Sequence, residues 1–149
     1  RALRLCRAVG LELQPPFVAF TPWITLAGSR ELLAVLLRLD LVPHVAPIQL
    51  ALRLLIPAGS RLLESPEIHG WIEGFDAAAL VHRWRHPDAQ VDALQRDVQR
   101  EVERGMGRGE AREEIFAAVA RLAGMEEAPR PVVAPARAPV PFLTEPWYC

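Results

Sequence analysis

The strongest constraint on the fold is the stretch 45–56, in which Gln49 and Arg53 are the only polar residues. A nearly continuous apolar run of this kind is typical of a strand buried on both faces, as in parallel sheets. The alternation of a strand places both polar residues on one face and leaves the opposite face wholly apolar. The run therefore predicts a buried parallel strand with two polar groups on one side.

A second strand and a helix are expected before this run. Residues 11–20 predict a strand, which Pro15 and Pro16 make irregular because proline donates no backbone hydrogen bond. We expect a right-handed βαβ unit, and therefore an α/β fold, with Thr25 or Ser29 as the N-cap of the intervening helix. That helix is indicated by an apolar stripe suited to lying on a sheet, formed by Leu32, Leu33, Leu36 and Leu37.

Helical patterns also occur on both sides of this unit. Ser60 is the expected N-cap of a short helix, and Asp76 of a longer one that His86-Pro87 interrupts. A long helix is expected to break at three glycines, Gly105, Gly107 and Gly109. The predicted helices occupy residues 1–9, 61–64, 77–84, 88–104 and 110–123.

Composition and charge exclude several classes of protein. The 17 basic and 18 acidic residues give a net charge of -1, which excludes a strongly basic nucleic-acid-binding surface. We find neither a secretory signal nor an apolar span long enough for a membrane, and so expect a cytoplasmic protein with no nucleic-acid or membrane partner. Two cysteines, Cys6 and Cys149, cannot form a disulfide framework.

Motifs for metal binding and catalysis are weak. His82 and His86 are four residues apart and would share a helix face, but no zinc-protease glutamate accompanies them and Pro87 follows at once. The pattern favours histidines on a surface or at a helix end. Cys6 lies in an apolar stripe and is interpreted as a small core residue.

Arg53 is the more informative residue. A buried guanidinium is costly unless it is paired with an anion. Near the carboxyl end of a barrel strand, Arg53 could meet a ligand carboxylate or phosphate. It could equally form a structural salt bridge with a carboxylate elsewhere in the fold, and the sequence leaves both alternatives open.

Several segments together resemble a known family. They comprise 10–26, 41–60, Trp84-Arg-His-Pro-Asp88, Val91-Asp-Ala-Leu-Gln95 and the terminal Thr144-Glu-Pro-Trp-Tyr-Cys149. Their order and combination resemble the later part of radical S-adenosylmethionine (radical SAM) enzymes. More narrowly, they are similar to the radical SAM proteins with a CUAEP or CCAEP tail, in which U is selenocysteine.

The resemblance implies a partial (βα)6 barrel that binds a 4Fe–4S cluster and S-adenosylmethionine. In such enzymes the cluster reduces the sulfonium, and the 5′-deoxyadenosyl radical formed takes a hydrogen atom from a substrate inside an enclosed barrel. The substrate would be an unidentified small molecule or peptide. Family members also carry a cobalamin-binding-like domain ahead of the barrel, so cobalamin is a further cofactor that the resemblance allows.

The sequence departs from the family in one respect. The Cys-x-x-x-Cys-x-x-Cys loop that holds the cluster is not among these residues, and by the resemblance it belongs before Arg1. We therefore expect the carboxy-terminal part of a longer enzyme, which by itself binds none of these cofactors and is inactive. No metal ligand can be assigned here.

The resemblance also suggests cofactor-binding candidates. Residues 11–20 and 45–56 would be about the fifth and sixth barrel strands, whose carboxyl ends help to contain S-adenosylmethionine and substrate. The candidates chosen from position and face are Thr21, Trp23, Gln49 and Arg53.

Three segments are expected along the chain. Residues 1–65 would be the last βαβ part of the barrel, 66–125 a helical segment, and 126–149 a disordered proline-rich tail. In the resembled family the next residue after Cys149 would be cysteine or selenocysteine, which predicts a redox tail cut at Cys149. The alternative is a stand-alone helical interaction module whose proline-rich tail recruits a partner.

Overall fold

The computed structural model describes residues 1–11 and 13–126, and in them the chain has a mixed α/β fold. The α-helices are α1 (Ala2–Ala8), α2 (Leu26–Arg38), α3 (Pro66–His69), α4 (Ala89–Arg108) and α5 (Arg112–Leu122). Three short 3-10 helices are η1 (Val42–His44), η2 (Pro47–Leu50) and η3 (Arg61–Glu64). The strands are β1 (Ile56–Pro57), β2 (Ile72–Asp76) and β3 (Val81–Trp84).

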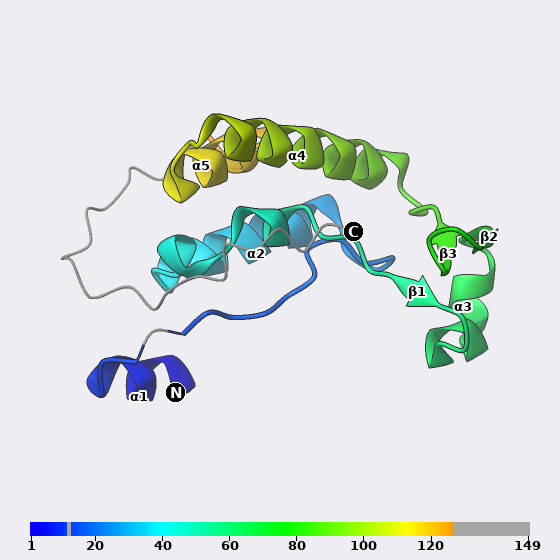
Figure 1. Ribbon diagram of the computed structural model, residues 1–149, viewed down its shortest axis with the longest axis horizontal. Coiled ribbons are helices and arrows are strands. Elements are labelled where there is room, and N and C mark those ends of the chain that lie inside the picture. Colours follow the sequence, from blue (N-terminus) through cyan, green and yellow to red (C-terminus); the bar gives the residue numbers. More distant parts are fainter. Residues whose placement is uncertain (12, 127–149) are drawn as a thin grey trace.

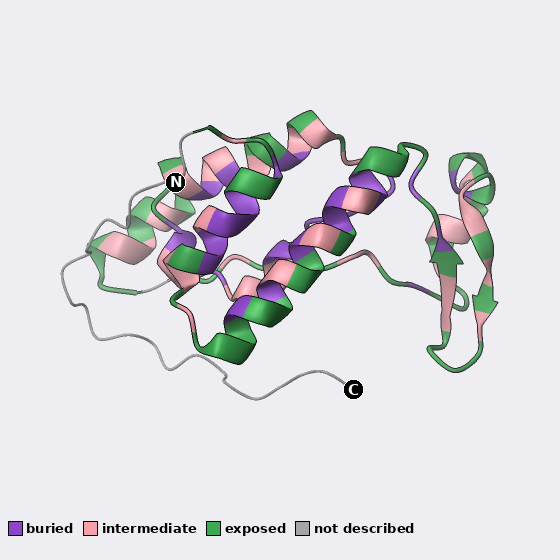
Figure 2. Cartoon of the chain, turned by 90° about the horizontal axis from the view of Figure 1, so that it is seen from above, coloured by how far each residue is buried: buried purple, intermediate pink, exposed green. Residues whose placement is uncertain are grey.

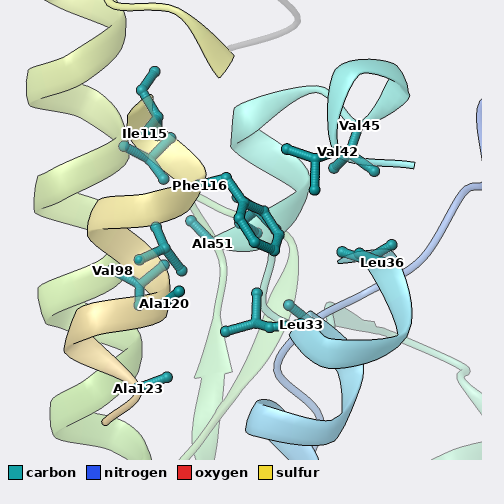
Figure 3. Close-up of a cluster of buried hydrophobic side chains, with 14 of the residues drawn as sticks. Leu33, Leu36, Val42, Val45, Ala51, Val98, Ile115, Phe116, Ala120 and Ala123 are labelled. Atoms are coloured by element: carbon teal, nitrogen blue, oxygen red, sulfur yellow. The ribbon is translucent and has the colours of Figure 1, made fainter. Parts of the chain in front are cut away.

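Helices α4 and α5 lie over α2 and over the chain that follows it (Figure 1). The core between them contains Phe116, which points from α5 towards Leu33 and Leu36 of α2 and towards Val42 of η1 (Figure 3). Phe116 is only 1% exposed. Burial of such a ring contributes roughly 1.5–3 kcal/mol, and it stabilises the packing of α5 against α2 and η1.

The N-caps of two elements are confirmed. The Thr25 side chain accepts a hydrogen bond from the Gly28 amide at 3.0 Å and begins α2. The Ser60 side chain accepts one from the Leu62 amide at 3.3 Å and begins η3. Short polar side chains at these positions supply acceptors for the otherwise unpaired amides of a first turn.

The long helix α4 continues past two of the glycines that were expected to break it. A Cβ at Gly105 would lie 2.6 Å from Cγ1 of Ile115, so this glycine lets α4 and α5 approach closely. The helix instead ends at Gly109, whose φ of 69° is the left-handed conformation that glycine adopts at little cost. The prediction of a break at Gly105 is therefore wrong, because packing against α5 overrides the low helix propensity of glycine.

The predicted strand over 45–56 is also wrong for most of its length. Pro43 lies within η1 and Pro47 begins η2, and their fixed φ and missing amides favour turns over a sheet ladder. Within it only Arg53, in a parallel bridge with Phe20, and Ile56, which begins β1 opposite His82, have backbone pairing. Two backbone hydrogen bonds make this bridge, from the Phe20 amide to the Leu52 carbonyl at 2.9 Å and from the Leu54 amide to the Phe20 carbonyl at 2.8 Å.

Residues 13–19 form no strand, although burial alternates along them. Leu13, Pro15 and Phe17 are more buried than Gln14, Pro16 and Val18, in agreement with the predicted two-residue period, and Ala19 and Phe20 are both buried. Consecutive prolines cannot donate to a ladder, so the segment stays extended until it reaches Phe20. What remains of the predicted βαβ unit is one parallel bridge with α2 between its two partners.

The predicted helix over 77–84 is instead part of a β-hairpin. Strands β2 and β3 pair antiparallel, with Asp76 opposite Val81. Asp76 Oδ1 accepts hydrogen bonds from the amides of Ala78 and Ala79, which are the bonds expected of an N-cap, but here they close the hairpin turn. Sequence alone does not separate these two uses of one aspartate, and the sheet pairing decides between them.

The hairpin lies with α3 at one end of the molecule, beyond α2, α4 and α5 (Figures 1 and 2). Strand β1 joins the free edge of β3, so the sheet order is β1-β3-β2. A second small core lies beneath this sheet and consists of Ile56, Ile68 and Trp84. In residues 1–11 and 13–126, no helix has the length and apolar character needed to cross a membrane. The predicted tail lies outside the described residues from position 127 onwards.

The contact at Gly105 gives a first prediction. Gly105→Ala should lower the free energy of unfolding by about 1–3 kcal/mol, because the new methyl group overlaps Ile115. Gly107→Ala is the matched control in the same helix. It meets nothing within 4 Å and should raise stability by roughly 0.5–1 kcal/mol through helix propensity. Urea denaturation measures both, and equal effects would contradict the close approach of α4 and α5.

A second prediction concerns Ser29, whose buried Oγ has no hydrogen-bond partner among the described residues. It borders an apolar cavity of about 20 Å³ between α2, α4 and α5. Ser29→Ala should therefore raise the free energy of unfolding by about 1 kcal/mol, since an unpaired hydroxyl is costly to bury. Ser60→Ala, which loses a cap, should lower it. If Ser29→Ala destabilises the protein, the hydroxyl has a partner such as a bound water.

Candidate functional site

The guanidinium of Arg53 links three separate segments of the chain through two hydrogen bonds and a ring contact. Its Nη1 donates to Oδ1 of Asp92 at 2.7 Å, and its Nη2 donates to the carbonyl oxygen of Trp84 at 2.7 Å. The guanidinium carbon also lies 3.7 Å from the centre of the Trp84 ring. One side chain from the parallel bridge thus binds both the hairpin and α4.

Asp92 is held as firmly as Arg53. Its second oxygen, Oδ2, accepts a hydrogen bond from the His86 amide at 3.1 Å. The Asp92 side chain is 11% exposed and that of Arg53 is 27% exposed, so water screens the pair only in part. Removing one partner of such a pair is costly, because the remaining charge stays in a poorly solvated place.

Two further side chains complete what we call the Arg53 network, formed by Arg53, Trp84, His86 and Asp92. Trp84 donates its indole N–H to the carbonyl of Leu54 at 2.8 Å. His86 contacts the Ile24 carbonyl through Nε2 at 2.8 Å, and its Nδ1 lies 2.9 Å from the Asp88 amide. The Ile24 carbonyl can only accept, so Nε2 donates to it, while Nδ1 also lies 3.0 Å from the Asp88 carbonyl oxygen.

The two histidines of the spaced pair do not share a face. His86 is buried just before α4, whereas His82 lies in β3 with its ring 5.1 Å from that of Phe75. A spacing of four brings side chains together only on a helix, and these residues are not helical. The structure therefore removes the geometry that a metal-binding pair would need.

The four candidates chosen from the sequence have separate surroundings. Arg53 meets a carboxylate of the protein itself, which is the structural salt bridge of the two alternatives. Gln49 donates to the Pro15 carbonyl and accepts from the Ala46 amide, both at 3.1 Å. Trp23 donates its indole N–H to Glu67 at 3.3 Å, and the Thr21 carbonyl accepts from Ile24 at 3.2 Å.

The described residues do not fit an iron–sulfur cluster. No group of three or more His, Cys, Asp or Glu side chains there could hold a metal ion. Cys6 is half-buried in α1 with a free thiol, and Cys149 lies outside the described residues. No step of a cluster-dependent reaction can be derived from these side chains.

The pKa shifts arise on α4 and α5, away from the Arg53 network. A hydrogen bond from Arg104 lowers the pKa of Glu101, and burial lowers the pKa of Arg112. Glu101 and Arg104 are three positions apart on one helix face, a spacing that supports the helix itself. The first shift is that of an ion pair within a helix, and the second is that of a partly buried arginine side chain. Neither shift indicates an acid–base centre.

Comparison with known proteins identifies no relative: no protein family, no curated protein and no solved structure matches the chain.

Sequence reasoning predicted that Arg53 needs an anion but did not identify Asp92 as its partner. Asp92 comes 39 positions later and was expected on a helix with an apolar stripe beginning at Val91. One signal was present, since Asp92 follows Val91 directly and both lie in the buried first turn of α4. An acidic residue beside an apolar stripe is the kind of partner that a buried arginine requires.

The network gives a third prediction. Arg53→Leu should lower the free energy of unfolding by about 2–4 kcal/mol, because Asp92 is left buried without a counter-charge. The double variant Arg53→Leu/Asp92→Leu should recover part of that loss. Chemical denaturation of the single and double variants measures the coupling between the two positions. Independent, additive effects would show that the pair contributes no specific stabilisation.

Proposed function

We propose that this chain is the carboxy-terminal part of a radical SAM enzyme, in which it completes the barrel wall. The proposal rests on a contact between the segments that resemble radical SAM enzymes. The segments 41–60, 84–88 and 91–95 are separate in sequence, yet Arg53 of the first contacts both Trp84 of the second and Asp92 of the third. Gln95 adds a hydrogen bond to the Ala51 carbonyl at 3.3 Å.

The parallel bridge supports the same proposal. A parallel pair needs a crossover connection, and here α2 provides it between Phe20 and Arg53. Phe20 of this bridge is buried in the core that it shares with residues of α2, α4 and α5. In the proposed enzyme, the neighbouring barrel strands would extend the sheet from this point.

The proposal assigns a supporting role to most of the described residues. Arg53 and Gln49 already have protein partners, so their role is to hold the bridge and the turn before it. Thr21 and Trp23 follow Phe20 at the carboxyl edge of the parallel pair, where α/β folds bind ligands. They remain the candidates for contact with S-adenosylmethionine or substrate, and the cluster would be bound by another part of the protein.

Expression of the complete gene tests the proposal. An in-frame Cys-x-x-x-Cys-x-x-Cys before Arg1, together with 5′-deoxyadenosine formation by the anaerobically reconstituted protein, is the expected result. A start codon directly before Arg1, or a full-length protein that binds no iron, would overturn it. A short gene would favour the alternative, a helical interaction module with a proline-rich tail.

A fourth prediction concerns the codons after Cys149. If the chain belongs to the family with the CUAEP tail, Cys149 is followed by UGA and then by codons for Ala-Glu-Pro. A Cys–selenocysteine pair would serve as a redox arm, because a selenol ionises at lower pH than a thiol and the ionised form is the nucleophile. Sequencing settles the prediction: a UAA or UAG codon, or UGA without Ala-Glu-Pro beyond it, contradicts it.

A further inference from the structure

Two tryptophans and a glutamate meet between the loop before α2 and the hairpin end of the molecule. The rings of Trp23 and Trp71 are 6.2 Å apart between centroids and inclined at 74°, so they form two nearly perpendicular walls. Trp23 donates its indole N–H to Oε2 of Glu67 at 3.3 Å, which fixes the carboxylate beside the rings. We call Trp23, Glu67 and Trp71 the aromatic corner.

The aromatic corner is partly open to solvent, with Trp71 half-buried against the small core. Trp23 is 46% exposed, although tryptophan is usually well buried, and Glu67 is also exposed. Among the described residues, Glu67 has no salt bridge within 4.0 Å. No cationic side chain of the described residues therefore pairs with this carboxylate, which lies at the edge of the Trp23 ring.

We propose that the aromatic corner binds a small organic cation of the alkylated ammonium class. The face of an indole ring attracts cations, and weakly hydrated alkylammonium groups are the best suited to lie against it. The Glu67 carboxylate also attracts a cation, whereas it does not attract a neutral apolar molecule of the same shape. The same chain already places a guanidinium 3.7 Å from the Trp84 ring centre, with Asp92 as its counter-charge.

The position of the corner fits ligand binding. Trp23 lies three residues after Phe20 of the parallel bridge, at the carboxyl edge where ligands of α/β folds bind. The contacts of Trp23 with Glu67 of α3 and with Trp71 join the helical part to the hairpin end. This inference does not depend on the radical SAM proposal, because it uses only the three side chains and their surroundings.

Choline provides the test probe, and its neutral isostere, with carbon in place of nitrogen, provides the control. NMR of the indole N–H groups in the full chain follows each tryptophan separately at constant ionic strength. We expect choline to shift the Trp23 and Trp71 signals saturably and to leave Trp84 unchanged. Equal shifts with the neutral isostere, or no shift with choline, would overturn the proposal.

Variants separate charge from shape. Glu67→Gln keeps an acceptor for the Trp23 N–H but removes the charge, and should weaken choline binding by about two- to fivefold. Trp23→Leu removes one wall and should weaken it by about fivefold. Glu64→Gln changes an exposed glutamate three positions away and should have no effect. Equal loss in Glu64→Gln and Glu67→Gln would also overturn the proposal, because it would indicate only a general charge effect.

Discussion

The ion pair between Arg53 and Asp92 connects the two parts of this structure. Arg53 lies at the one parallel bridge, and Asp92 lies in the first turn of α4. The same guanidinium binds the Trp84 carbonyl at the end of the hairpin. Nη1 and Nη2 of Arg53 and both oxygens of Asp92 have hydrogen-bond partners, so the two opposite charges are paired and hydrogen-bonded.

This arrangement explains how a chain with two separate cores keeps one geometry. The large core lies among α2, α4 and α5, and the small one lies around Ile56 beneath the hairpin. Apolar packing is non-directional and does not fix how two such cores are joined. The joining segments are held instead by directional bonds, among them the Trp84 indole to Leu54 and the His86 ring to Ile24.

Capping residues and the spacing of apolar residues correctly predicted those elements that are determined by neighbours in the sequence. The caps at Thr25 and Ser60 and the helix α2 are confirmed, because each depends on neighbouring residues alone. The strand over 45–56 was wrong because Pro47 begins a 3-10 turn within the apolar run. The helix over 77–84 was wrong because Val81–Trp84 pair with β2, which precedes the turn, and with β1, which lies farther back in the sequence.

For the Arg53 network, the sequence predicted only that Arg53 requires an anion as its partner. A guanidinium in an apolar run requires a counter-charge, but sequence does not say whether a ligand or the protein supplies it. The contact of Trp23 with Glu67 spans 44 positions and leaves no local pattern. Side chains that meet through tertiary structure are therefore the part that sequence reasoning does not reach.

Native-state hydrogen exchange tests most directly whether the Arg53 network joins the two parts. The account predicts that the Leu54 amide and the Trp84 indole N–H exchange in the same cooperative unit as the buried amides of α4, and that Arg53→Leu releases them from it. Rapid exchange at Leu54 and Trp84 in the unaltered protein, while α4 remains protected, would contradict the account.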